Sequence, residues 1–395
     1  MVRPRQCLST RAAYGPLDGI SAGQGASKHA DIFTNGNNHE GIMKPVNFGI
    51  IGCGVIGTVH LKSTQETDHV NVVALADMRD GLVRARAQEY HVENAYTDAD
   101  ELLADPNIEA VVLALPAHAR TDLALRALRQ GKHVLTEKPV AINANEVQRL
   151  MAAQGDRIVA CCSSRFHFLP ATQAATDFIA TGALGDLRVI RCRAIAPSRP
   201  NPEQLPPAWR LSKALNGGGI MSNWGCYDLD YLLGITGWSL QPETVFGQTW
   251  TVPAPLAEQV TPNSDAETHL TALIRCSNGC AITYERGEYV AAPAAAAWEI
   301  IGDRGSLTLQ MTPGQDKALT FYQASPTTGR SSQIIWQGDD SYADIHPGPM
   351  ADMATAIRTG RPPQTSLDRA LIIQQITDAI YASAAEGQAI AISAS

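Results

Sequence analysis

The chain has 395 residues, of which 45% are apolar and 18% charged, and its formal net charge is −8 at pH 7. This length allows two domains with separate cores, and the composition is that of a globular protein. The negative charge argues against a nucleic-acid or anionic-membrane partner. The sequence contains no apolar run near the ~20 residues that span a bilayer.

The eight cysteines are scattered along the chain, which favours reduced, mostly buried thiols and a cytoplasmic location. Cys276 and Cys280 form a CxxxC pair, but no second Cys or His pair at zinc spacing lies near them, so we expect no metal site. Residues 1–43 are rich in Gly, Ser, Asn and His without periodicity, which predicts a disordered tail. Met43 stands immediately before the first apolar run and is a candidate start of the native protein.

Residues 44–164 are predicted to form a first domain in which short apolar runs alternate with helical segments. Asp98 is a typical capping residue at the N-terminus of one such helix, and Gly131 is a typical residue at the C-terminus of another. The apolar runs predict buried parallel strands at 46–51, 71–77, 110–115, 133–135 and 157–162. This alternation predicts a doubly wound sheet with right-handed crossovers.

A glycine-rich turn joins the first apolar run to the first helical segment. It reads Gly52-Cys53-Gly54-Val55-Ile56-Gly57. The pattern is GxGxxG between a strand and a helix, with Asp77 about 20 residues further on, which is the context of a dinucleotide-binding turn. We therefore expect Gly52, Gly54, Val55, Ile56 and Gly57 to hold a pyrophosphate at the helix N-terminus. A glycine-rich loop without a ligand is the alternative.

Asp77 ends the second apolar run and is predicted to accept hydrogen bonds from the adenosine ribose. An acid at this position repels a phosphate, so the sequence favours NAD over NADP. Arg79 lies two residues further on and could instead neutralise a 2′-phosphate.

Thr136-Glu137-Lys138-Pro139 follows the run at 133–135, at the carboxyl edge where such sheets bind ligands. Lys138 is therefore expected at the mouth of the cofactor crevice, where its charge could hold a substrate hydroxyl. A surface lysine before a helix-starting proline is the alternative.

Residues 165–395 are predicted to form a second domain of different character. Helices at about 170–181 and 221–233 flank a strand at about 186–196. Later runs alternate apolar and polar residues and predict an antiparallel sheet of six or more strands. The expected fold is an α/β Rossmann domain followed by an α+β domain with an open, mostly antiparallel sheet.

Three glycines, Gly217 to Gly219, precede the helix at about 221–233. Regular helical spacing would place Asn223, Tyr227 and Asp230 on one face, which indicates a lined cavity in an otherwise apolar helix. A satisfied interfacial tyrosine is the alternative.

Together these motifs resemble the Gfo/Idh/MocA oxidoreductase family, which includes glucose–fructose oxidoreductase and inositol dehydrogenase. The resemblance runs from about residue 44 to 392, and its carriers are GIIGCGVIG, YTDADELLADPNIEAVVLALPAHAR, GKHVLTEKPVA, GALGDLRVI and GGGIMSNWGCYDLDYLLG. It implies a Rossmann domain, and an open sheet through which a homodimer or homotetramer forms. Family substrates are mostly sugars, polyols and their derivatives.

The resemblance also implies roles for single residues. Lys138 matches the family's catalytic lysine, and Pro116, His118 and Glu137 match positions that line the cofactor. The family's usual Asp-x-x-x-His is Asn223-x-x-x-Tyr227 in this chain.

An amide does not exchange protons at neutral pH, so Asn223 is expected to orient groups. Tyr227 has a reference pKa of about 10 and needs a nearby cation to act as the acid/base. Some family members, glucose–fructose oxidoreductase among them, also carry Tyr at the His position.

Several further residues are candidate substrate ligands. In related proteins the loops that hold Arg165, Trp209, Arg210 and Lys213 border the sugar site, and Asp230 lies on the predicted polar face of the helix. The basic residues of these loops could indicate an acidic sugar, or they could be solvated loop charges.

The sequence therefore predicts an NAD-dependent sugar or polyol dehydrogenase with Lys138 and Tyr227 at its centre. One alternative is an NAD-dependent glycoside hydrolase that works by transient ring oxidation and elimination. A second is a non-enzymatic NAD-binding sensor.

Overall fold

The computed structural model describes residues 43–200 and 202–392. The predicted disordered tail at 1–43 lies outside these residues apart from Met43. A parallel sheet comes first in the chain, with strand order β3-β2-β1-β4-β5-β6. Its strands are β1 (Val46–Ile51), β2 (Val70–Ala76), β3 (Asn94–Tyr96), β4 (Ala110–Leu113), β5 (His133–Thr136) and β6 (Val159–Cys161). This order is the doubly wound Rossmann arrangement, and it confirms the predicted fold of the first part.

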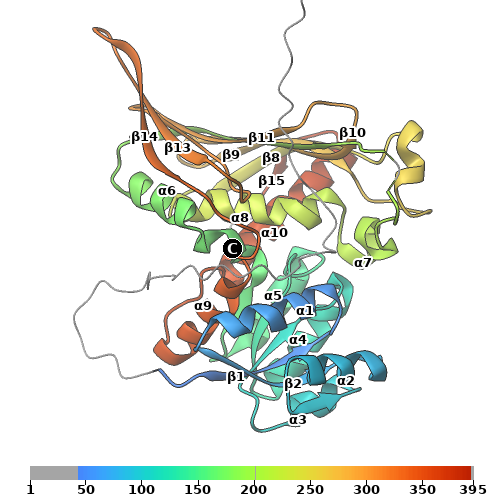
Figure 1. The fold of residues 1–395 in the computed structure, drawn as a ribbon. Helices are drawn as coiled ribbons and strands as arrows, with labels where there is room; N and C mark the ends of the chain where they lie inside the picture. Colours follow the sequence, from blue (N-terminus) through green and yellow to red (C-terminus); the bar gives the residue numbers. More distant parts are fainter. Residues whose placement is uncertain (1–42, 201, 393–395) are drawn as a thin grey trace, which may run out of the picture. The chain divides into compact units, whose positions relative to one another are not determined.

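Helices cross between these strands, as Figure 1 shows. They are α1 (Val55–Ser63), α2 (Asp80–Glu89), α3 (Ala99–Ala104), α4 (Arg120–Arg129) and α5 (Ala144–Gln154), with short 3₁₀ turns η1 (Thr64–Glu66), η2 (Ala117–Ala119) and η3 (Cys162–Phe168). Asp98 caps α3 by accepting from the backbone N–H of Asp100 at 2.9 Å. Gly131, with φ 72°, follows the end of α4 in the left-handed conformation that glycine adopts freely.

A mixed sheet follows, with strand order β14-β13-β12-β11-β7-β10-β9-β8-β15. Its strands are β7 (Leu187–Pro197), β8 (Pro242–Trp250), β9 (His269–Cys276), β10 (Ala281–Val290), β11 (Ala295–Gly302), β12 (Ser306–Leu309), β13 (Lys317–Ser325), β14 (Gly329–Gly338) and β15 (Ile390–Ala391). All neighbours are antiparallel except β7 and β10, which pair in parallel. This matches the expected open, mostly antiparallel sheet.

One face of the mixed sheet is covered by helices (Figure 1). They are α6 (Pro170–Ala180), η5 (Met221–Gly225), α8 (Cys226–Ile235) and α10 (Leu367–Glu386); the short elements η4 (Ala208–Leu211), α7 (Lys213–Asn216) and η6 (Ala254–Gln259) lie in the connections. Side chains alternate along β9, where Leu270, Ala272 and Ile274 are buried toward the helices. Phe246 and Leu273 are exposed on the other face.

The last two helices connect the two sheets. Met350, Met353 and Ala354 of α9 (Pro347–Thr359) lie in the hydrophobic cluster of the parallel sheet. Helix α10 contributes Leu371 to the parallel-sheet core and Ile376 to the mixed-sheet core. The domain boundaries 44–164 and 165–395 remain predictions. Helix α9 belongs to the second of these ranges but packs on the parallel sheet of the first. None of the helices in the described part of the chain is long and apolar enough to cross a bilayer.

Candidate active site

The predicted cofactor residues gather at the carboxyl edge of the parallel sheet. The glycine turn follows β1, Asp77 follows β2, Pro116 follows β4 and Lys138 follows β5. Strands β1 and β4 are neighbours whose helices run to opposite sides, so the crevice between their ends is the place where such sheets bind ligands.

The three glycines of the turn have different surroundings. A Cβ on Gly52, whose φ is 99°, would overlap the carbonyl oxygen of Ala114, and one on Gly57 would overlap the carbonyl oxygen of Gly52. A Cβ on Gly54 would find Arg79 Nη2 at 3.9 Å as its nearest neighbour. The first and third glycines therefore allow close packing, whereas the second leaves open space beside the turn.

Helix α1 begins directly after this open space. Gly54 is its N-cap, and among the described residues no side chain caps it. The first N–H groups of a helix have no partner within the helix, and its dipole favours an anion there. Val55 is exposed and Ile56 is partly exposed. The turn and the start of α1 therefore fit the pyrophosphate of a dinucleotide.

Asp77 is held on two sides. Its Oδ2 accepts from the backbone N–H of Cys53 at 2.9 Å, and its Oδ1 accepts from Arg79 Nε at 2.8 Å. The hydrogen bond from Arg79 is the main reason that the pKa of Asp77 falls to about 2. The carboxylate is therefore ionised at neutral pH, and the exposed Arg79 lies beside it.

Lys138 reaches from the end of β5 to the helix that follows the three glycines. Its Nζ donates to the backbone carbonyl of Asn223 at 2.8 Å. Burial lowers the pKa of this partly buried lysine below its ordinary value.

The segment that holds Asn223 is η5, a turn of π-helix. The Asn223 side chain donates to the carbonyl of Arg210 at 3.0 Å and accepts from Asn216 at 3.3 Å. Asn223 thus positions groups, and it meets Lys138 through its backbone. The prediction of a single polar face assumed regular α-helical spacing. A π turn holds more residues than an α turn, so it changes the directions in which the side chains after it point.

Tyr227 lies one turn further along, and its ring faces Lys138. The Nζ atom is 5.2 Å from the ring centroid. The hydroxyl is buried, and its oxygen accepts from Arg165 Nη1 at 2.6 Å. Burial raises the pKa of Tyr227 well above its usual value, and Arg165 acts against that rise.

Arg165 links Tyr227 to two further buried groups. Its Nη2 donates to Glu137 Oε1, which also accepts from His60 Nε2 at 2.8 Å. Burial alone would raise the pKa of Glu137, but Arg165, with His60 and Lys138, holds it well below the ordinary range. Glu137 therefore anchors this network behind the lysine, and His60 is a site residue that sequence reasoning missed.

The donor atoms of His60, Glu137 and Cys162 lie within 4.8 Å of one another. A metal ion there would compete with the guanidinium of Arg165 for the Glu137 carboxylate and would face its positive charge. The residues present therefore suit an arginine–carboxylate pair better than a cation.

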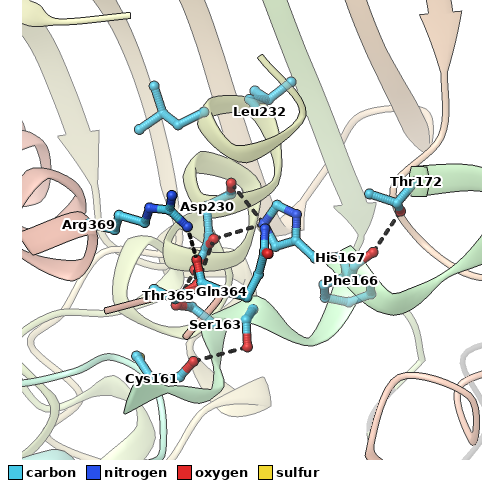
Figure 2. A network of polar contacts seen from close by, with 12 residues as sticks. Cys161, Ser163, Phe166, His167, Thr172, Asp230, Leu232, Gln364, Thr365 and Arg369 are labelled. Atoms are coloured by element: carbon cyan, nitrogen blue, oxygen red, sulfur yellow. Dashed lines mark hydrogen bonds and ion pairs between the residues drawn. The ribbon is translucent and has the colours of Figure 1, made fainter. Parts of the chain in front are cut away.

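Asp230 is bound by other groups of the protein. Its carboxylate is fully buried and accepts from Thr365 at 2.8 Å, from His167 at 2.9 Å and from Ser163. Figure 2 shows these side chains converging on it from η3 and from the segment before α10. Asp230 therefore joins these segments to α8, and its role as a substrate ligand stays a prediction.

The other predicted substrate residues differ in their burial and in their contacts. Arg165 is 3% exposed and donates to the Tyr227 hydroxyl, and its role as a substrate ligand stays a prediction. Arg210 binds Glu288 through both terminal nitrogens at 2.8 and 2.7 Å, so its charge is already paired. Trp209 is exposed.

Two more predicted residues lie near the loop before the glycines. His118 donates through Nδ1 to the carbonyl of Leu215 at 3.1 Å. Lys213 lines a cavity of about 1090 Å³ together with Trp250 and Glu267. Lys138 and Tyr227 are not among the residues that line this cavity.

Comparison with known proteins identifies the family and supports the fold. Residues 46–165 match the model of an oxidoreductase family with an NAD-binding Rossmann fold, and residues 172–308 match the GFO/IDH/MocA C-terminal domain. Levoglucosan dehydrogenase in complex with NADH has a similar fold, with a TM-score of 0.78 and 21% identity over 88% of this chain and 99% of that chain.

Relatives in sequence cover different shares of the chain. An oxidoreductase of Rhizobium meliloti, ORF334, is 33% identical over 52% of this chain and 59% of its own length. An oxidoreductase of Synechocystis sp., sll0816, is 30% identical over 66% and 70%. Myo-inositol 2-dehydrogenase of Thermotoga maritima is 24% identical over 81% and 91%. The chain therefore belongs to the Gfo/Idh/MocA family of NAD-binding oxidoreductases.

Proposed function

We propose that this protein is an NAD-dependent dehydrogenase that oxidises a CH–OH group of a sugar or polyol. The observation that carries the proposal is the meeting of Lys138, from the edge of the parallel sheet, with Tyr227 of α8, at 5.2 Å from ammonium to ring centroid. The similarity to myo-inositol 2-dehydrogenase and levoglucosan dehydrogenase supports a sugar or polyol as the substrate.

The glycine turn and the start of α1 would hold the pyrophosphate of NAD, and Asp77 would bind the adenosine ribose. Bound NAD supplies the acceptor for the hydride that leaves the substrate carbon. The ionised Asp77 supports NAD over NADP, because its carboxylate can accept hydrogen bonds from ribose hydroxyls and a 2′-phosphate removes one of those donors. Arg79 is paired with that carboxylate, so each offsets the charge of the other.

Lys138 and Tyr227 would do the proton chemistry. Lys138 donates one N–H to Asn223, and an ammonium group has two more for a substrate oxygen. In the proposed reaction Tyr227 takes the proton of the substrate hydroxyl, and Lys138 stabilises the negative charge that develops on that oxygen. The same groups acting in reverse would protonate the carbonyl oxygen during reduction.

The experiment that tests this function is an NADH assay with NAD and a panel of neutral and acidic sugars and polyols. The proposal predicts substrate-dependent NADH from at least one of them. Aryl glycosides in the same panel distinguish the elimination mechanism, because that reaction releases the aryl group and reducing sugar with no net NADH. Tight NAD binding without turnover of any panel member would contradict the dehydrogenase and favour the sensor.

We also propose a cytoplasmic homo-oligomer, a homodimer or homotetramer, that assembles through the outer face of the mixed sheet. Phe246 and Leu273 are cross-strand partners on β8 and β9, and both are about half exposed there. The described cysteines are all unpaired and buried, which supports a reducing compartment. Sedimentation of the protein and of Phe246→Glu tests the assembly, since a charge on a buried interface should shift it toward the monomer.

A further inference from the structure

Charged groups lie close to the buried Tyr227. The almost fully buried Arg165 donates to its oxygen, and Lys138 lies above its ring. The carboxylate of Glu137, which Arg165 binds directly, has the opposite sign. A cation in contact with the phenol oxygen favours the phenolate.

Arg165 is the member of this cluster that touches Tyr227. Its Nη1 lies 2.6 Å from the phenol oxygen, while its Nη2 binds Glu137. A guanidinium donates and never accepts, so the Tyr227 oxygen is the acceptor in this bond. The phenol O–H therefore points away from Arg165 and remains available for another partner.

We propose that Arg165 is a positioning residue of the site: it orients the Tyr227 hydroxyl and stabilises the phenolate that receives the substrate proton. The inference rests on the proposed function and replaces the predicted role of Arg165 as a substrate ligand. The step starts from the phenolate, which forms when the neutral phenol releases its own proton to solvent at alkaline pH. The substrate O–H bond then breaks and its proton bonds to the phenolate oxygen. The C–H electron pair leaves as hydride to NAD⁺, and a carbonyl remains.

The two bonds of Arg165 explain why an arginine suits this position. The planar fork reaches two oxygen atoms on different elements, α8 and the loop after β5, and holds both in fixed directions. A lysine offers a single nitrogen and would satisfy one partner well. Glu137, itself held by His60 at 2.8 Å, fixes the guanidinium from behind.

Several charged or titratable groups face Tyr227, and their signs set the expected pH dependence. Burial of the phenol raises its pKa, and the guanidinium of Arg165 lowers it again. The Glu137 carboxylate favours the neutral phenol, so its effect is opposite to that of Arg165. The groups are Arg165 from η3, Glu137 and Lys138 from the loop after β5, Cys226 from α8 and Cys162 at the start of η3, with His60 and His346 behind Arg165 and Glu137.

The test measures the phenol itself as well as turnover. The ultraviolet absorbance of phenolate is followed against pH in the wild type, and the same titration of Tyr227→Phe is subtracted to isolate one phenol among the 10 tyrosines. Arg165→Met should move this transition to higher pH by about one unit or more, and the alkaline-rising limb of kcat by a similar amount. Arg165→Lys should lie between the two.

A variant that should shift the phenol transition in the opposite direction distinguishes an effect of charge from an effect of misfolding. Glu137→Gln keeps the shape of the side chain and removes its negative charge, so it should move the phenol transition to lower pH. Lys317→Met is the control for loss of a buried cation, because Lys317 binds Asp340 at 2.7 Å in β13 and lies outside this cluster. It should lower stability without moving either pH curve.

The outcomes separate the two proposals. If Arg165→Met raises KM and leaves both pH curves in place, Arg165 is a substrate ligand and the positioning role is overturned. An unchanged phenol transition in both Arg165→Met and Glu137→Gln also overturns it. If the wild type turns over no sugar, the proposed function fails, while the phenol titration still decides whether Arg165 controls Tyr227.

Discussion

Lys138 and Asn223 are joined by a hydrogen bond of 2.8 Å between an ammonium group and a backbone carbonyl. The bond connects the carboxyl edge of the parallel sheet to the π turn η5 that leads into the helix of Tyr227. A π turn interrupts the regular ladder of helix hydrogen bonds and is frequent at functional sites. The position of the Lys138 side chain therefore depends on the π turn η5, which lies in the second predicted domain.

Lys138→Met should reduce turnover by at least about 100-fold, because a methyl group cannot stabilise the developing oxyanion. NAD binding, followed by quenching of protein fluorescence, should change little. Lys132→Met is the matched control: Lys132 donates to the carbonyls of Asp105 and Ile108 in the same part of the chain. That control should lose about 1–3 kcal/mol of stability and keep its activity. Equal loss of turnover in both variants would contradict the assigned role.

The glycine turn predicts different consequences for three alanine substitutions. Gly57→Ala should lower the free energy of unfolding by about 1–3 kcal/mol, because its Cβ would overlap the Gly52 carbonyl. Gly54→Ala should fold normally and bind NAD more weakly, since its methyl group would enter the open space. Gly81→Ala, with no heavy atom within 4 Å of its Cβ, is the control and should affect neither property adversely. Thermal unfolding with and without NAD measures all three.

Asp77→Ala should change the cofactor preference. It removes the acceptor of the Cys53 N–H bond and of the ribose, so affinity for NAD should fall by roughly 10- to 100-fold. Arg79, freed from its pair, should then favour the 2′-phosphate of NADP. Kinetics with both cofactors measure the ratio, and Asp77→Ala/Arg79→Ala should lose the gain with NADP. An unchanged ratio in the single variant would show that Asp77 does not select NAD.

His133 should make the fold sensitive to acid. Its Nδ1 accepts from the N–H of Ile158 at 2.8 Å, and burial lowers its pKa from 6.5 to about 4. Between these values the unfolded chain binds the proton and the folded chain does not, so stability is present above pH 6.5 and is lost as the pH falls toward 4.

Thermal unfolding of His133→Asn across this range should show a weaker pH dependence than the wild type. His346, whose pKa burial lowers to about 3, contributes in the same direction and should leave part of the slope. His91→Asn is the control, because His91 is exposed and its φ of 56° suits asparagine. A slope unchanged by His133→Asn would contradict this assignment.

Local patterns were sufficient to predict that the candidate cofactor residues lie together. The glycine turn, Asp77 and Lys138 each follow directly after a strand, and strand ends meet at one edge of a parallel sheet. The family of the chain could also be recognised from these motifs. Strand β14 offers no alternation of buried and exposed residues for a sequence pattern to report, since most of its residues are exposed.

The proton side of the site depends on contacts that no local pattern reports. Arg165 is 62 residues from Tyr227 and 28 from Glu137, and His60 is 77 from Glu137. Asp230 was placed with Tyr227 because a regular helical period was assumed, but its partners Ser163 and Thr365 come from distant segments. The spacing of residues along the sequence predicts neither the π turn nor these hydrogen-bond partners.

The most direct measurement of the central claim is NADH formation by Tyr227→Phe on a sugar or polyol that the wild type oxidises, with NAD binding measured in the same samples. Tyr231→Phe is the control, a buried tyrosine one turn further along the same helix. We expect Tyr227→Phe to lose turnover by about 100-fold or more while it binds NAD normally, and Tyr231→Phe to remain active. Full activity of Tyr227→Phe would contradict the claim that its phenol carries the substrate proton.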